Sequence, residues 1–354
     1  MPRRIFLHVG APKSGTTSLQ SRLLLNERAL RRHGLTYPLG PLRDPEIHYR
    51  AALDVTGKDH GLDPRTLRDA WPRLRRAVRR SRGDVVVSHE IFSSASEEQA
   101  RRVLEDLSGT GDEVHVVVTA RDLARELASG WQEMVKFGST RSFAAYMRRA
   151  RENRLGFMAS FDVPRLLTVW GADLPADRLH VVTAPAAGSP DVLWRRFLDA
   201  LGVPADVAPR EAARVNESIG VAQARLLRRL NRELGDDARR GGAASPLIES
   251  VVVPGMGSRP AARITIGPHD HPWVVERTER WTRWLRDRGV RVHGDLDDLV
   301  PEPPAPRWVD PDRRMPRQVA DAAVATVADL LVELQARPPS RVTRARRALR
   351  RLRG

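Results

Sequence analysis

The 354-residue sequence contains no cysteine, which excludes disulfide bonds, zinc–thiolate sites and a cysteine nucleophile. Catalytic chemistry must therefore come from carboxylate, imidazole and ammonium groups. No apolar run approaches the ~20 residues that span a bilayer, and the apolar stretch near the N-terminus is too short for a signal peptide. We therefore expect no transmembrane segment and a cytoplasmic location.

Lysine is scarce: Lys13, Lys58 and Lys136 are three of 60 basic residues. The formal net charge of +16 favours an anionic partner. Eight arginines lie in residues 337–354, which contain no acid, so half of the charge is local to this tail. Aromatic residues make up 5%, and no nucleic-acid recognition motif is present, so we expect no specific nucleic-acid partner. A polyanion-binding protein that acts through the tail is a further alternative.

Short apolar, β-branched runs alternate with helical patterns, which is typical of a parallel sheet covered by helices on both faces. The predicted fold class is α/β, a three-layer sandwich around a central parallel sheet of about five strands, with a helical C-terminal extension. The expected strands are residues 5–9, 35–38, 84–88, 114–119 and 179–183. A first helical pattern ends at Gly34, and further helices are expected at 65–80, 96–107, 122–136, 190–201, 221–234, 273–288 and 318–334.

The segment GAPKSGTT, residues 10–17, follows the first strand and precedes a helix. Backbone N–H groups at a helix N-terminus, together with the helix dipole, favour an anion there. Gly15 permits close approach of the backbone, and Lys13 adds an ammonium group. Hydroxyl donors are contributed by Ser14, Thr16 and Thr17. The segment therefore predicts a phosphate-binding loop.

The Walker A loop, G-x-x-x-x-G-K-[ST], is the obvious comparison. Gly10 and Gly15 have the matching spacing, but Thr16 stands where the Walker lysine would be, and Lys13 lies inside the loop. The sequence P-K-S-G-T-T instead resembles the 5′-phosphosulfate loop of the sulfotransferases that use 3′-phosphoadenosine 5′-phosphosulfate (PAPS). This resemblance implies a P-loop-like fold.

A second element of the same family is an arginine at the end of a strand, followed eight residues later by a serine. Together they bind the 3′-phosphate of the donor. Here Arg121 follows the predicted strand 114–119, and Ser129 lies eight residues further on. The resemblance therefore implies that Arg121 and Ser129 hold the 3′-phosphate.

The predicted strand 84–88 leads into Ser88-His89-Glu90, two candidate bases at the same sheet edge as the loop. The family places its base in this neighbourhood, as a histidine in many small-molecule enzymes and a glutamate in many carbohydrate and bacterial ones. The stretch looks like a variant of the bacterial S-S-E pattern. We therefore expect Glu90 to be the base, with His89 second, and Lys13 to stabilise charge on the bridging oxygen.

The resemblance implies a PAPS-dependent sulfotransferase that needs no metal and acts on a hydroxyl or amine of a small-molecule or carbohydrate acceptor. The family's C-terminal K-G-x-x-G-D-W-K element is absent, which fits a divergent bacterial group better. The arginine excess and the stretch His293–Leu299 resemble actinobacterial sequences. The expected segments are a sulfotransferase-like α/β domain (1–300), a proline-rich linker with a C-terminal helix (301–336) and an arginine-rich tail (337–354). The oligomeric state cannot be read from these patterns.

The alternative enzyme class is a P-loop nucleoside or small-molecule kinase that uses ATP–Mg. Such an enzyme needs an acidic magnesium ligand at a strand end, which Asp122 or Glu90 would supply. Thr16, in place of the Walker lysine, weighs against it.

Overall fold

The computed structural model describes residues 2–40, 42–109, 111–185, 190–211, 218–235 and 261–336. Within these limits the chain forms two compact units. Unit 1 comprises Met1–Gly130, Ala144–Asn216 and Thr265–Trp308, and unit 2 comprises Trp131–Phe143, Glu217–Ile264 and Val309–Gly354. The expected division into 1–300, 301–336 and 337–354 stays a prediction, and its last segment lies outside the described residues.

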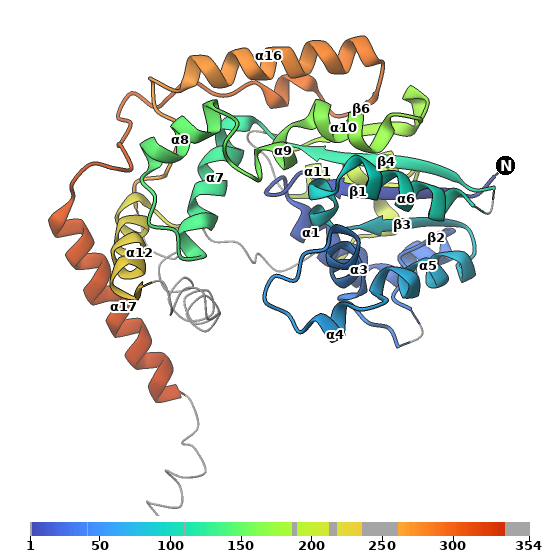
Figure 1. Cartoon of the computed structure of the whole chain (residues 1–354), viewed down its shortest axis with the longest axis horizontal. Coiled ribbons are helices and arrows are strands. Elements are labelled where there is room, and N and C mark those ends of the chain that lie inside the picture. The colour runs from blue at the N-terminus through green and yellow to red at the C-terminus, as the bar shows by residue number, and fades with distance from the viewer. Residues whose placement is uncertain are drawn as a thin grey trace, which may run out of the picture. The chain divides into compact units, whose positions relative to one another are not determined.

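Unit 1 is built on one open sheet of six parallel strands in the order β2-β3-β1-β4-β5-β6 (Figure 1). The strands are β1 Arg4–Gly10, β2 Leu35–Thr36, β3 Asp84–Ser88, β4 Glu113–Ala120, β5 Leu179–Thr183 and β6 Arg291–His293. All five predicted strands are present, although β2 covers only the first half of the predicted range 35–38. The sixth, β6, was not predicted because its sequence, Arg-Val-His, offers no apolar run.

Helices connect successive strands and also follow the last strand. Those of the described residues are α1 Thr16–Leu25, α2 Glu27–Arg32, α3 Ile47–Thr56, α4 Pro64–Leu67, α5 Ala70–Arg80, α6 Glu97–Ser108, α7 Leu123–Lys136, α8 Phe143–Arg151, α9 Met158–Phe161, α10 Val163–Gly171, α11 Pro190–Ala200, α12 Val221–Glu233, α16 His271–Arg288 and α17 Pro316–Ala336. The first predicted helix is divided at Asn26, and the predicted helix 65–80 is divided before Ala70. Four helices, α3, α8, α9 and α10, were not predicted. No helix of the described ranges is long and apolar enough to cross a membrane.

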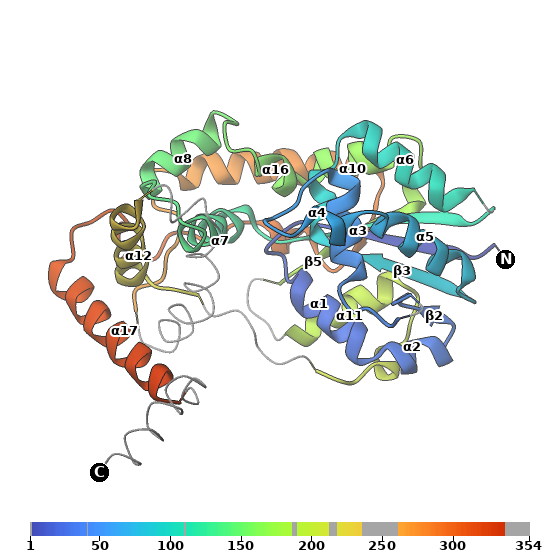
Figure 2. The same cartoon turned by 60° about the horizontal axis from the view of Figure 1, so that its bottom comes forward.

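Helices cover both faces of the sheet, as the alternating pattern predicted. Figure 2 shows α1, α2 and α11 on one face and α6 and α10 on the other. Successive residues of β1 point to opposite faces, and all are buried from Ile5 onward. The core on the α1/α11 face contains Phe6, Leu19, Leu23, Val86, Val117, Val182, Trp194 and Phe197. On the other face, Trp170 of α10 packs edge-on against Phe92, with ring centroids 5.9 Å apart.

The strand order determines which loops are neighbours. β1 lies between β3 and β4, with His8 opposite Ser88 on one side and Leu7 opposite Val116 on the other. The connection that follows β1 runs toward one edge of the sheet, to β2. The connections that follow β3 and β4 run toward the opposite edge, to β4 and β5. In doubly wound folds, ligands bind beyond the carboxyl ends of the strands where the direction of connection reverses. Here that place lies beyond the end of β1.

Unit 2 contains the end of α7 together with α12 and α17. Its interior includes Asn231, whose buried side chain donates to the carbonyl oxygens of Val135 (2.8 Å) and Ser139 (3.1 Å). Gln132 accepts from the N–H of Ile219 at 3.1 Å. The buried side-chain amides of Asn231 and Gln132 therefore connect α12, and the residues just before it, to the end of α7.

Removal of the Ser96 side chain should destabilise α6. The sequence predicted a capping box there, and the structure confirms it: Ser96 Oγ accepts from the N–H of Gln99 (3.2 Å), and Gln99 Oε1 accepts from that of Ser96 (2.9 Å). We expect Ser96→Ala to lower the free energy of unfolding by about 1 kcal/mol in urea titrations. Ser108→Ala, at the exposed end of the same helix, is the control, and an equal loss there would contradict a capping effect.

Candidate functional site

The loop from β1 to α1 makes a tight turn that needs unusual backbone angles. Gly10 (φ 108°), Lys13 (φ 66°) and Gly15 (φ 100°) all adopt positive φ. A Cβ atom on Gly15 would also lie 2.5 Å from Cδ2 of Leu193. These positions explain the two glycines of the motif, because residues with a Cβ rarely adopt such angles. Lys13 holds a strained conformation, which is typical of ligand-binding turns.

The N-terminus of α1 opens at the end of this loop. The helix begins at Thr16, and its cap residue, Gly15, has no side chain that could cap it. Leu19 is the residue whose N–H bonds back to the Gly15 carbonyl, at 3.2 Å. The N–H groups of Thr16, Thr17 and Ser18 precede that first helical bond, so they remain for an anion, as at other helix N-termini.

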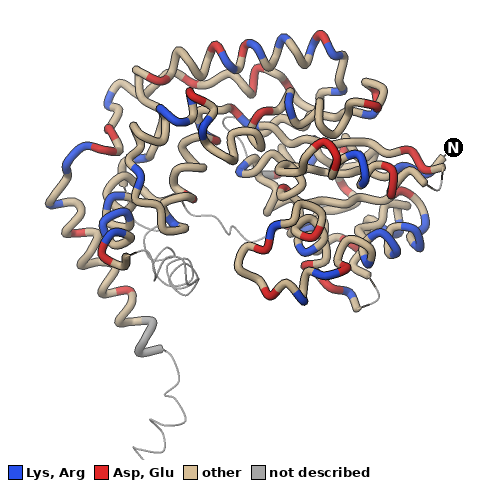
Figure 3. The backbone as a smooth tube through the Cα atoms, viewed as in Figure 1, with Lys and Arg blue, Asp and Glu red and all other residues tan. Residues whose placement is uncertain are grey.

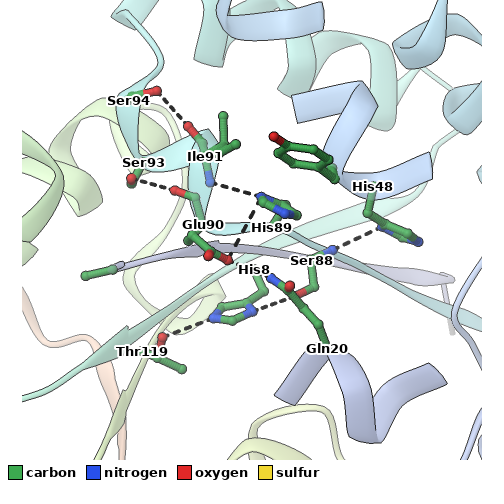
Figure 4. Close-up of polar contacts among 12 residues, drawn as sticks. His8, Gln20, His48, Ser88, His89, Glu90, Ile91, Ser93, Ser94 and Thr119 are labelled. Carbon is green, nitrogen blue, oxygen red and sulfur yellow. Dashed lines mark hydrogen bonds and ion pairs between the residues drawn. The ribbon is translucent and has the colours of Figure 1, made fainter. Parts of the chain in front are cut away.

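A series of hydrogen bonds joins the loop to β1, β3 and β4, and Figure 4 shows its part from Thr119 through His8 to Ser88. Ser14 Oγ donates to the Ala11 carbonyl (2.5 Å) and so accepts from the Thr119 hydroxyl (2.5 Å). Thr119 in turn accepts from Nε2–H of His8 (3.1 Å), whose Nδ1 then accepts from Ser88 Oγ (2.7 Å). Each hydrogen bond in this series therefore has a defined donor and a defined acceptor. The three central strands hold the loop in place through these bonds.

These hydrogen bonds give the Ser14 hydroxyl a different role from the one expected. The sequence suggested a hydroxyl donor to the ligand, but Ser14 is buried and its hydroxyl donates to the loop itself. Thr16 is also buried, Lys13 is half-buried and Thr17 is exposed. Ser14 can therefore offer an anion its backbone N–H, and the side chain of Thr16 forms a hydrogen bond with Glu90 instead of facing solvent.

Glu90 lies directly beside the loop. It begins a 3₁₀ turn, η1 (Glu90–Ser94), after β3, and its Cα is 3.3 Å from where a Cβ on Gly10 would stand. Gln20 of α1 donates to Glu90 Oε2 at 2.9 Å (Figure 4). Burial would raise the pKa of Glu90, but His89 and the hydrogen bonds from Gln20 and Thr16 outweigh it and hold this pKa below its usual value. Glu90 is therefore an ionised carboxylate at neutral pH, with 25% of its side chain exposed.

His89, the other predicted base, is differently engaged. Its Nδ1 accepts from the N–H of Ile91 at 3.2 Å and lies 3.9 Å from Glu90 Oε2 (Figure 4). Burial lowers the pKa of His89 and outweighs the opposing effect of Glu90, so at neutral pH the ring is neutral and carries its proton on Nε2, and it gains a charge only in acid. Its ring lies 5.1 Å from that of Tyr49, whose hydroxyl is 3.5 Å from Nδ1 of His60.

Arg121 reaches the loop from the other side. It follows β4 and donates from Nη1 to the Lys13 carbonyl at 3.4 Å. Burial and the neighbouring Arg125 lower its pKa. Ser129 lies about two turns along α7 and is half-buried, and no hydrogen bond joins it to Arg121 in the described ranges. The structure thus brings Lys13, Glu90 and Arg121 together, and leaves the pairing of Arg121 with Ser129 as a prediction.

Several residues at the site were missed from the sequence. Gln20 and Tyr49 reach Glu90 and His89 from α1 and α3, and α3 itself was not predicted. Glu126, in the first turn of α7, is fully buried, and neither of its carboxyl oxygens has a hydrogen-bond partner among the described residues. Burial and the neighbouring Asp122 raise the pKa of Glu126 well above its usual value, against the opposing effect of Arg121. No sequence signal distinguished Glu126 from an ordinary helix glutamate.

Comparison with protein-family models, curated proteins and solved structures finds no match for this chain. In the part of the chain that the structure describes, no group of three or more histidine, aspartate or glutamate side chains is arranged to hold a metal ion. The chemistry of the site is therefore inferred from its own geometry.

The buried imidazole of His8 should make stability depend on pH. Burial lowers the pKa of His8 to about 3, whereas an unfolded histidine titrates near its usual 6.5. The unfolded chain therefore binds more protons, and the stability present at neutral pH is lost as the pH falls below 6.5. Between pH 7 and pH 5 this loss amounts to about 2 kcal/mol for each such histidine.

His8→Gln should remove that contribution, because glutamine can donate to Thr119 and accept from Ser88 without titrating. We expect urea unfolding of the variant to lose about 2 kcal/mol less than the wild type between these pH values. His33→Gln, at an exposed position, is the matched control. A pH dependence of His8→Gln as steep as that of the wild type would contradict the assignment.

Proposed function

We propose that the chain is a sulfotransferase of P-loop-like fold that transfers the sulfuryl group of PAPS to a hydroxyl or amine of a small-molecule or carbohydrate acceptor. The observation that carries the proposal is the arrangement around one turn. The β1–α1 loop has an open helix N-terminus, with the Glu90 carboxylate on its β3 side and the Arg121 guanidinium on its β4 side. An anion cradle flanked by a base and a cation suits transfer from an anionic donor to a neutral acceptor.

In this proposal PAPS, the sulfuryl donor, binds to the β1–α1 loop and to the residues that follow β4. The N–H groups of Thr16 and Thr17, with Lys13, suit the 5′-phosphosulfate, because backbone donors, the helix dipole and an ammonium group all favour negative charge. Arg121, with Ser129 further along α7, is our candidate for the 3′-phosphate. The donor supplies a sulfuryl group on a good leaving group, and the chain's part is to hold the anions and orient them.

Glu90 is the better candidate for the base. At neutral pH it is ionised and partly exposed, whereas the lone pair of His89 Nδ1 is occupied by the N–H of Ile91. In the proposed step the acceptor oxygen or nitrogen forms a bond to sulfur and its proton passes to Glu90. The bond between sulfur and the bridging oxygen breaks, and Lys13 stabilises the electron pair left on that oxygen.

The first test is binding of the desulfated product, 3′-phosphoadenosine 5′-phosphate. We expect the wild type to bind it in calorimetry and Lys13→Ala and Arg121→Ala each to weaken binding by about tenfold or more, since each removes a charge-assisted hydrogen bond. Lys58→Ala and Arg101→Ala, both at exposed positions, are the charge-matched controls and should bind normally. Absence of binding to the wild type, or preference for ATP–Mg, would overturn the proposal, and the latter would favour the kinase.

The second test concerns the base, in a screen of acceptors with labelled PAPS. Glu90→Gln should lose about 10²–10⁴-fold in turnover while still binding the desulfated product, whereas His89→Asn should keep most of its activity. Because the pKa of Glu90 is held below its usual value, kcat/KM should be flat through the neutral range and fall only in acid. Activity that survives Glu90→Gln but not His89→Asn would transfer the role to His89.

A further inference from the structure

Unit 2 contains a cavity of about 310 Å³ that lies among arginine side chains. Its lining residues are Ser142, Arg225, Arg228, Arg232 and Asp312, which we call the arginine pocket. The three arginines are spaced i, i+3 and i+7 on α12, so they share one face of the helix. Figure 3 shows basic residues on successive turns of α12.

Arg228 is the fixed centre of the pocket. Only 10% of its side chain is exposed, its Nε donates to the Thr140 carbonyl (3.3 Å), and its guanidinium lies 5.7 Å from the Trp131 ring centroid. Nη1 pairs with Asp312 Oδ1 at 2.7 Å, and this oxygen also accepts from the N–H of Phe143 at 3.2 Å. A buried guanidinium held on several sides is pre-organised, so little side-chain entropy is lost when a ligand binds to it.

The lining has an excess of positive charge. Three guanidinium groups face one carboxylate, and that carboxylate oxygen is already shared between Arg228 and a backbone N–H. Burial lowers the pKa of Arg228, Asp312 opposes this, and Arg232 and Arg225 lower it further. The three cations are therefore close enough to repel one another, and an anion between them would relieve that repulsion.

We infer that the arginine pocket binds a phosphate or sulfate group of a small molecule. Guanidinium groups match the oxygens of such groups with paired hydrogen bonds. The volume lies at the lower end of the range of small-molecule sites, ~300–1,000 Å³, which favours a small ligand over a polymer. None of its residues belongs to the β1–α1 loop, so the inference does not depend on the proposed function.

The test is calorimetry of the full chain with inorganic phosphate, inorganic sulfate, glucose 6-phosphate and glucose 6-sulfate. It is performed in the Lys13→Ala background, so that the β1–α1 loop contributes as little as possible. Arg225→Ala/Arg232→Ala should weaken binding by about 100-fold, because two charge-assisted hydrogen-bonding groups are lost. Arg225→Lys/Arg232→Lys should weaken it less, since the charges remain and the paired donors do not.

The matched control is Arg229→Ala/Arg317→Ala, which removes the same charge from exposed positions of α12 and α17 in the same unit. Binding of this control should equal that of the parent. Tighter binding of the glucose esters than of the free ions would identify an ester as the ligand, and equal binding a free ion. Absence of binding by all four probes, or an equal loss in the control, would overturn the inference.

Discussion

The pairing of β1 with β3 on one side and β4 on the other is the constraint on which the site depends. It brings the ends of three strands to one place, although Glu90 and Arg121 lie far from the β1–α1 loop in the sequence. Hydrogen bonds continue the ladder beyond the strands: the N–H of His89 bonds to the His8 carbonyl at 3.1 Å, and that of Ala11 to the Thr119 carbonyl at 2.7 Å. The loop is thus an extension of the sheet, which explains how it keeps a strained conformation.

The protonation states around this loop follow from burial. His8 is fully enclosed and neutral, so it serves as an oriented donor and acceptor between Thr119 and Ser88. Glu90, at the partly open edge, receives hydrogen bonds and stays ionised, whereas burial and Asp122 raise the pKa of the enclosed Glu126. Two carboxyl groups in the same unit therefore have pKa values shifted in opposite directions, because burial is outweighed at Glu90 and dominates at Glu126. The ionised state of Glu90, together with the occupied lone pair of His89 Nδ1, is the physical basis for choosing Glu90 as the candidate base.

Much of the fold could be predicted because it is encoded locally. The valine runs of β3 and β5 gave their bounds, and the Ser96–Gln99 pair gave the start of α6. The predictions were wrong where contacts between residues distant in the sequence determine the structure. Asn26 interrupts the first helix because its side chain donates to the Arg210 carbonyl (3.0 Å) and accepts from the Arg210 N–H (3.0 Å). In the same way, Lys13 and Glu90 were found from their neighbours along the chain. The roles of Gln20 and Tyr49 and the inward direction of the Ser14 side chain depend on the order of the strands. They could therefore not be predicted from neighbours along the chain.

The dependence of the loop on β3 and β4 also links ligand binding to folding. A chain in which the three strands are unpaired has no cradle, because neither Glu90 nor the His8 hydrogen bonds then support the turn. An anion that binds there binds the native state alone, and by mass action it adds about 2.7 kcal/mol to the stability at a hundred times its dissociation constant. A higher concentration of such a ligand in the cell would then raise the folded fraction of the chain and lengthen its half-life.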